Sequence, residues 1–136
     1  MDRLAVVAGY AYNTTRLSET SGLGAKGDWY ANAPHLIGNA RLSYQAVAEP
    51  TVGLTLGAGG RVVSERLGVI QDQRWFRLPG YTLVDAAANL RVGGTTLSAT
   101  VTNALNARWF PGGYYSRVLV IVGDPRSFRL ALTRRF

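Results

Sequence analysis

The chain has 136 residues, 16 glycines, no cysteine and a net charge of +7, which comes from 14 arginines and one lysine against 8 acidic residues. The length fits one domain or part of one, and the absence of cysteine excludes disulfide frameworks and thiolate metal sites. The arginines are spread along the chain and no nucleic-acid-binding signature accompanies them, so we expect no nucleic-acid partner.

Six segments alternate between apolar residues and small or polar ones. They are residues 4–14, 36–47, 52–65, 81–92, 95–103 and 126–136. Each approaches or exceeds the about 9–11 residues of a tilted membrane-spanning strand, whereas no apolar run reaches the about 20 residues of a membrane-spanning helix. The pattern predicts an all-β chain of about six antiparallel meander strands with one apolar face and one polar face.

The links between these segments alternate in length. Residues 48–51 and the Gly-Gly pair at 93–94 form tight turns, and the glycine pair suits a two-residue hairpin with positive φ. The links 16–35, 66–80 and 104–125 are long. Outer-membrane β-barrels place short turns on the periplasmic side and long loops on the extracellular side, so we expect a barrel wall in the outer membrane of a Gram-negative bacterium.

Aromatic residues lie near the predicted strand ends, where a membrane barrel carries its aromatic girdles. They are Tyr10, Tyr12, Tyr44, Tyr81, Trp109, Phe110 and Phe136. A soluble protein would instead bury such residues in its core. Because the short and long links also alternate as in a membrane barrel, we interpret these aromatic residues as girdle residues.

Two of the long links combine arginine with aromatic side chains. The candidate ligand-binding residues there are Arg74, Trp75, Arg77, Trp109, Tyr114, Tyr115 and Arg117. Such a surface can hold an anionic, partly aromatic chelate through charge and stacking. Packing between the loops is the alternative role for the same residues.

The sequence offers no catalytic or metal site. His35, the single histidine, has no metal-ligating companions. Ser43 lies on the same predicted strand about 26 Å away, which excludes a direct dyad. We therefore expect no enzymatic activity, no cofactor and no resident metal.

Three stretches resemble the C-terminal barrel of TonB-dependent outer-membrane receptors. They are LPGYTLVDA at 78–86, VTNALNARW at 101–109 and GDPRSF at 123–128, which leads into the last predicted strand. The resemblance covers nearly the whole chain, most specifically residues 78–136. It implies that residues 1–136 are the C-terminal portion of a transmembrane β-barrel, which has about 22 strands in the full-length family. The family's plug domain, its energy-coupling box and a signal peptide are expected to be absent from these residues.

The resemblance further implies that the chain forms part of the barrel wall and extracellular loops of a receptor for ferric siderophore uptake. Its partners would be outer-membrane lipid, the remaining barrel strands, the plug and, only through the missing N-terminal parts, the TonB complex. Six strands leave two unpaired edges in lipid, so we do not expect the chain to be active alone. The alternative is a small soluble or secreted β-barrel or sandwich that acts as a binding module, in which Leu42, Leu54, Val101 and Leu132 would converge on one dry core.

Overall fold

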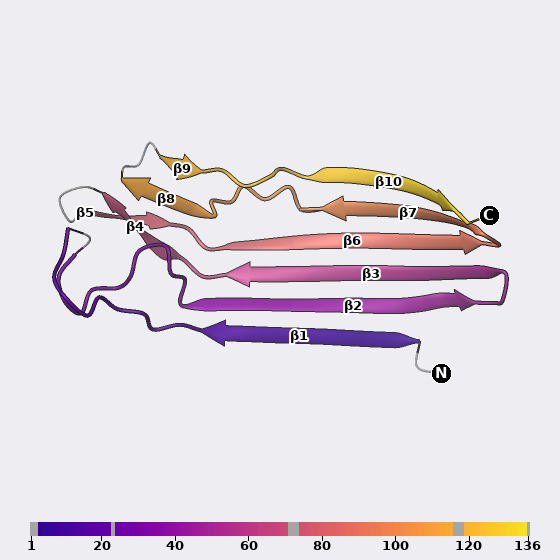
Figure 1. Ribbon diagram of the computed structural model, residues 1–136, viewed down its shortest axis with the longest axis horizontal. Coiled ribbons are helices and arrows are strands. Elements are labelled where there is room, and N and C mark those ends of the chain that lie inside the picture. Colours follow the sequence, from indigo (N-terminus) through magenta and orange to yellow (C-terminus); the bar gives the residue numbers. More distant parts are fainter. Residues whose placement is uncertain (1–2, 23, 71–73, 116–118, 136) are drawn as a thin grey trace.

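The main body of the protein is a single antiparallel sheet in the order β1-β2-β3-β6-β7-β10. The computed structural model describes residues 3–22, 24–70, 74–115 and 119–135. The strands of this sheet are β1 (Leu4–Tyr12), β2 (Leu36–Ala48), β3 (Val52–Val63), β6 (Tyr81–Val92), β7 (Thr95–Thr102) and β10 (Ser127–Arg134). The tight turns lie at one end of the sheet and the long links at the other (Figure 1). The predicted meander of six strands is thereby confirmed.

Four short strands lie in the long links, where the sequence predicted none. They are β4 (Arg66–Ile70), β5 (Arg74–Leu78), β8 (Gly112–Tyr115) and β9 (Val120–Ile121), which form a second sheet in the order β5-β4-β8-β9. The β4–β5 hairpin continues the register of the β3–β6 ladder past a break at 64–65 and 79–80. Pro79 has no N–H to donate, so the ladder stops there and resumes beyond it.

The tight turns form as the sequence predicts. Val92 pairs with Thr95 across a two-residue loop in which Gly93 has φ +52°. A β-carbon on Gly94 would lie 2.9 Å from the backbone oxygen of Arg135, so this position has no room for a side chain. In the other turn, the N–H of Glu49 donates to the Val52 carbonyl at 2.8 Å.

The registers place the apolar side chains of neighbouring strands in continuous rows on one face, here called the apolar face. One row consists of Val6, Leu42, Ala58, Ala86, Val101 and Phe128. The next consists of Leu4, Tyr44, Leu56, Ala88, Ala99 and Leu130. A bulge between Gln45 and Val47 then brings Val47 opposite Leu54, which keeps the following row apolar.

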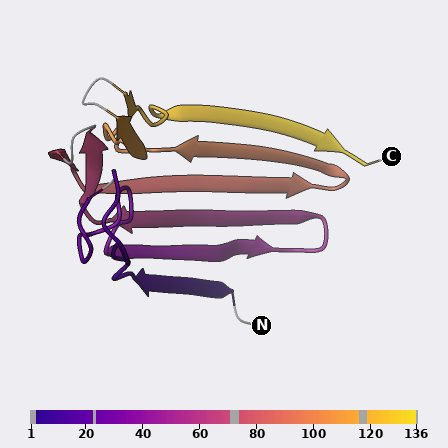
Figure 2. The same ribbon diagram turned by 60° about the vertical axis from the view of Figure 1, so that its left-hand side comes forward.

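The apolar face is open. Leu42 and Leu132 are 41% and 73% exposed, and Leu54 and Val101 are only half-buried. These residues therefore do not converge on a dry interior, as the soluble alternative required. The main sheet is a single layer (Figure 2), and the described residues contain no helix long and apolar enough to cross a membrane.

The buried residues lie at the loop end instead of the middle of the sheet. Within the described part of the chain, the buried hydrophobic side chains are Val63, Phe76 and Leu78. The Phe76 ring lies directly over Gly68 and Gly113 and leaves no room for a β-carbon at Gly68. A small core thus holds the second sheet together at the point where the main sheet ends.

Gly80 provides a test of this junction. A β-carbon there would lie 2.8 Å from the Val63 oxygen and 3.0 Å from the Glu65 nitrogen, both of them backbone atoms. We expect Gly80→Ala to lower the free energy of unfolding by about 1–3 kcal/mol, because the backbone has to shift. The measurement is the urea midpoint of the folded protein in detergent micelles.

Gly38→Ala is the matched control, since a β-carbon at Gly38 would meet nothing within 4 Å. We expect its midpoint to be unchanged or slightly raised. Equal midpoints for the two variants would contradict the close approach at Gly80.

Candidate functional site

The second sheet gathers four of the predicted ligand-binding positions around one strand. β4 lies between β5 and β8, and its residue Val69 pairs with both Trp75 and Tyr114. Arg74 and Tyr115 pair in the same way with the next residue of β4. Two links that are far apart in the sequence therefore meet in one sheet at the loop end of the molecule (Figure 1). Arg117 lies outside the described residues.

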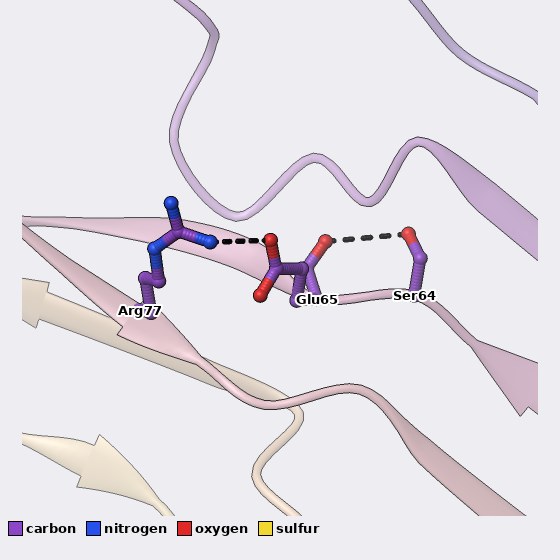
Figure 3. Close-up of polar contacts among 3 residues, drawn as sticks. All are labelled: Ser64, Glu65 and Arg77. Carbon is purple, nitrogen blue, oxygen red and sulfur yellow. Dashed lines mark hydrogen bonds and ion pairs between the residues drawn. The ribbon is translucent and has the colours of Figure 1, made fainter.

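Arg77 belongs to the same sheet and its guanidinium is exposed. Its Nη1 atom lies 2.6 Å from Oε1 of Glu65, and the two side chains are 72% and 58% exposed (Figure 3). The two residues are diagonal neighbours across the continued ladder, since Leu67 pairs with Arg77. Exposed pairs of this kind contribute about 0–1 kcal/mol, so an incoming anion can replace Glu65 at little cost.

Ser64 fixes the backbone next to this pair. Its hydroxyl donates to the Glu65 carbonyl at 3.2 Å (Figure 3) and accepts the N–H of Leu36 at 3.0 Å. The bond with Leu36 joins the end of β3 to the start of β2. The backbone next to the Glu65–Arg77 ion pair is thus fixed by the hydrogen bonds of Ser64.

Trp109, in contrast, lies outside the strands of the second sheet and has a structural role. Its ring centroid lies 4.9 Å from that of Tyr81, and its Nε1 donates to the Asp124 carbonyl at 3.0 Å. The ring also lies against Gly123, where it leaves no room for a β-carbon. Alternation in β6 puts Tyr81 on the same face as Asp85, the polar face, so the predicted girdle role of Tyr81 is wrong.

Asn103 is the centre of a network that sequence reasoning missed. It is 4% exposed with φ +49°, and its backbone N–H donates to Oδ1 of Asp85 at 2.8 Å. Its amide bonds both the N–H and the carbonyl of Ala107, and it also donates to the Asp124 carbonyl at 3.1 Å. The available signal was the stretch VTNALNARW, because asparagine tolerates a left-handed backbone and can bond nearby peptide groups.

Asn32 joins the first long link to two strands of the second sheet, β4 and β8. Its Nδ2 donates to the Gly113 carbonyl and its Oδ1 accepts the Gly113 N–H, both at 3.0 Å. Its own N–H donates to the Leu67 carbonyl at 2.7 Å. With φ +58°, Asn32 uses a conformation that most residues avoid. The side chain and the backbone of this one residue thus join three segments of the loop end.

Arg66 is a buried cation at the base of the second sheet. It is 4% exposed, its Nη2 donates to the Phe110 carbonyl, and its guanidinium lies 5.5 Å from the centre of the Tyr81 ring. Its Nε has no partner within the described residues. Arg66 therefore connects the link that contains Phe110 to Tyr81, the first residue of β6.

The first long link is packed by its own side chains. The Arg16 guanidinium lies 3.8 Å from the centre of the Trp29 ring, and the His35 ring meets Trp29 edge-on at 3.9 Å. His35 Nδ1 lies 3.2 Å from the Asn13 carbonyl. Among the described residues, no group of three or more His, Cys, Asp or Glu side chains is placed to hold a metal ion. The chemistry of the loop end is thus hydrogen bonding, stacking and positive charge.

Residues 3–104 match the family model for the TonB-dependent receptor-like β-barrel. The chain is 29% identical over 136 residues to the metal-pseudopaline receptor CntO of Pseudomonas aeruginosa, an alignment that covers 99% of this chain and 19% of that receptor. It is 34% identical over 92 residues to the ferrioxamine receptor of Yersinia enterocolitica, covering 68% of this chain and 12% of that receptor. The chain thus spans about a fifth of the length of the first relatives.

A solved structure shows the same fold. The ferric-catecholate import receptor Fiu from E. coli superposes with a TM-score of 0.82 at 19% identity, over 100% of this chain and 19% of that chain. The six-stranded sheet and its loop end therefore share the fold of about a fifth of that solved chain.

Asn32→Asp tests the link between the three loop segments. The substitution keeps the shape of the side chain but replaces the Nδ2 donor by an oxygen that faces the Gly113 carbonyl. We expect a loss of about 1–3 kcal/mol of local stability. The measurements are faster amide exchange at Gly113 and faster proteolysis of residues 16–35 in the folded protein.

Asn13→Asp is the matched control, because the Asn13 Oδ1 only accepts hydrogen bonds from Thr15 and a carboxylate keeps that role. Exchange and proteolysis should stay unchanged in this variant. If Asn32→Asp behaves like Asn13→Asp, the amide of Asn32 does not hold the loops together.

Proposed function

Because the chain belongs to the TonB-dependent receptor β-barrel family, we propose that it forms wall and extracellular loops of an outer-membrane receptor for ferric siderophores. The whole receptor would bind the chelate on the outside and pass it to the periplasm. In this proposal residues 1–136 are a C-terminal segment of the barrel. The family consists of receptors and not of enzymes, and we assign this chain no enzymatic step.

The open apolar face is the observation on which the proposal depends. The two rows described above contain no charged residue, and they end on the edge strands in exposed side chains such as Val6 and Phe128, at 62% and 75%. In water such a surface causes aggregation, whereas in a bilayer it is the surface that acyl chains cover. The long links all lie at one end of the main sheet, which would be the extracellular side of a membrane barrel.

The unpaired edges of the main sheet are an argument that the chain belongs to a larger barrel. β1 and β10 are the two outer strands, so each has one side without a ladder partner in the described chain. Every unsatisfied backbone group in hydrocarbon costs several kcal/mol, so we propose that further barrel strands flank both edges. The plug would be a partner of this wall, and the TonB complex would be engaged only through the parts of the receptor outside this chain.

For the ligand, we propose a metal chelate of the siderophore type, as the names of the relatives suggest. The contacting residues would be Arg74, Trp75, Arg77, Tyr114, Tyr115 and Arg117. The support is that the backbones of four of these meet around β4 while Arg77 presents an exposed charge beside them. We leave Trp109 out of this set because its ring and its N–H are used within the chain.

Adjacent alanines on β6 test the membrane assignment. Ala86 lies in a central row of the apolar face, and Ala87 points to the opposite face. We expect Ala86→Arg to destabilise the inserted receptor by about 2–4 kcal/mol, and Ala87→Arg to be tolerated for insertion. The measurement is outer-membrane fractionation with heat-modifiable migration on a gel. Equal insertion of both variants would rule out a lipid-facing apolar side.

Arg77 tests the ligand assignment. We expect Arg77→Gln to weaken binding of a ferric catecholate, which is anionic, about fivefold at low salt, the effect of losing about 1 kcal/mol. The difference should shrink as salt rises, because exposed charges are screened. Binding is measured with iron-loaded chelate on whole cells.

The control is Arg91→Gln at the opposite end of the sheet, where Arg91 bonds the turn carbonyls of Pro50 and Glu49. Its affinity for the chelate should match that of the unmodified receptor. A normal affinity in Arg77→Gln would remove Arg77 from the binding surface without affecting the membrane assignment.

A further inference from the structure

The apolar face has a groove of about 390 Å³ across three of its strands, here called the apolar groove. Phe128 and Leu130 of β10 lie along one side of it. Its floor consists mostly of small side chains from two register rows of β6 and β7, which are Ala86, Ala88, Ala99 and Val101. A further strand beside β10 would pair in the plane of the sheet, so it would leave this groove open.

Arg126 lies at the end of the apolar groove that is nearest to the long links. Its guanidinium lies 5.8 Å from the centre of the Phe128 ring, so its charge is beside an apolar side chain of the groove. The guanidinium donates one long hydrogen bond, from Nη1 to the Ala104 carbonyl at 3.5 Å. No carboxylate among the described residues forms an ion pair with it. Arg126 therefore presents a charge and several donors at the loop end of an apolar surface.

Asn106 provides a second donor beside Arg126. Its Oδ1 accepts the backbone N–H of Arg126 at 3.1 Å, which places its amide next to that residue. Asn106 is exposed, and its Nδ2 donates no hydrogen bond within the described part of the chain. Together with Arg108 and Pro125, it lines a hollow of about 530 Å³. A polar hollow with a nearby cation thus adjoins one end of the apolar groove.

We propose that this surface binds one phosphorylated, acylated glycolipid of the outer leaflet, with a phosphate on Arg126 and Asn106 and an acyl chain in the apolar groove. The proposal rests on the proposed function, which places the apolar face in lipid and the long links outside the cell. A guanidinium gives phosphate oxygens charge-assisted hydrogen bonds, and an acyl chain fills an apolar groove. We choose a glycolipid over a phospholipid because the hollow beside Arg126 offers space for a sugar.

The head group has to supply most of the preference for one lipid. Acyl chains cover the whole apolar face in a bilayer, and bulk lipid is as apolar as the groove. Filling the groove therefore gains only the closer packing of one chain against alanine and Phe128. The phosphate, in contrast, finds an unpaired guanidinium in one place on this face. We thus expect the loss of Arg126 to weaken lipid binding more than a change in the groove.

The whole receptor in detergent micelles tests the site, with lipid A as the probe. Native mass spectrometry counts the lipid A molecules that each receptor retains and measures their affinity. We expect one tightly bound lipid A in the unmodified receptor. Arg126→Gln should weaken its binding about tenfold, the effect of losing a hydrogen bond to a charged group. Ala88→Leu fills the apolar groove and should weaken binding about threefold, because bulk lipid replaces the lost contact.

Two control variants make the same chemical changes elsewhere. Arg134→Gln removes a charge from the turn end of β10, and Ala8→Leu enlarges a side chain on the apolar face of β1, outside the groove. Both should retain lipid A as the unmodified receptor does. Arg126→Lys keeps a positive charge without the planar guanidinium, so it should recover part of the affinity that Arg126→Gln loses.

Other probes identify the part of the lipid that is bound. Dephosphorylated lipid A should bind about tenfold more weakly than lipid A, and Arg126→Gln should not weaken it further. Phosphatidylglycerol has an anionic phosphate but no sugar, so binding as tight as that of lipid A overturns the glycolipid. Displacement of lipid A by inorganic phosphate at equal concentration overturns the role of the acyl chain.

Equal retention of lipid A by the unmodified receptor and Arg126→Gln overturns the site. Unchanged binding in Ala88→Leu overturns the groove, since no acyl chain then lies in it. Heat-modifiable migration and outer-membrane fractionation are measured on the same variants. A receptor that inserts in the outer membrane but retains no lipid A loses this site and keeps the proposed function, whereas failure of the unmodified receptor to insert contradicts the proposed function itself.

Discussion

The rest of the structure depends on one constraint: each inner strand of the main sheet satisfies its backbone through its two neighbours, while the apolar side chains of the sheet stay uncovered. The six strands of the main sheet pair in antiparallel order from β1 to β10, and successive side chains along each strand point to opposite faces. A shift of one residue would reverse the faces of a strand. The bulge near Gln45 is informative for this reason, because the extra residue restores Val47 to the apolar rows.

The loop end is held only in part by the same means, since the strands of the second sheet have two to five residues. Side-chain amides supplement these short ladders: Asn32 bonds both the N–H and the carbonyl of Gly113, and Asn103 joins residues from two sides of its link. Both asparagines have positive φ, which a β-branched residue tolerates poorly. The small core around Phe76 adds burial, and the buried Arg66 adds a contact with the Phe110 carbonyl. The loop surface is therefore positioned by specific polar contacts more than by its buried area.

The sequence was sufficient for the six long strands, their faces and the turn at Gly93, because these follow from a period of two and from local turn chemistry. It was not sufficient for the second sheet, since β4 and β8 pair in parallel across about 45 residues and no local pattern announces that contact. Tyr81 was misplaced by its position near a strand end, although alternation with its neighbours already put it on the polar face. The role of Trp109 depends on Asp124 and Gly123, which only the folded chain brings beside it.

The break at Pro79 and Gly80 shows how the surroundings change along one hairpin. The register is continuous across the break, yet the Arg66 guanidinium beyond it lies 5.5 Å from the centre of the Tyr81 ring, on the polar face and not on the face of Val62. Val62 is 46% exposed, whereas Arg66 and Leu78 beyond the break are 4% and 2% exposed. An apolar side chain can remain uncovered where acyl chains replace water, whereas the side chains beyond the break are covered by protein. The break at Pro79 and Gly80 therefore separates the exposed residues of the main sheet from the buried residues of the second sheet.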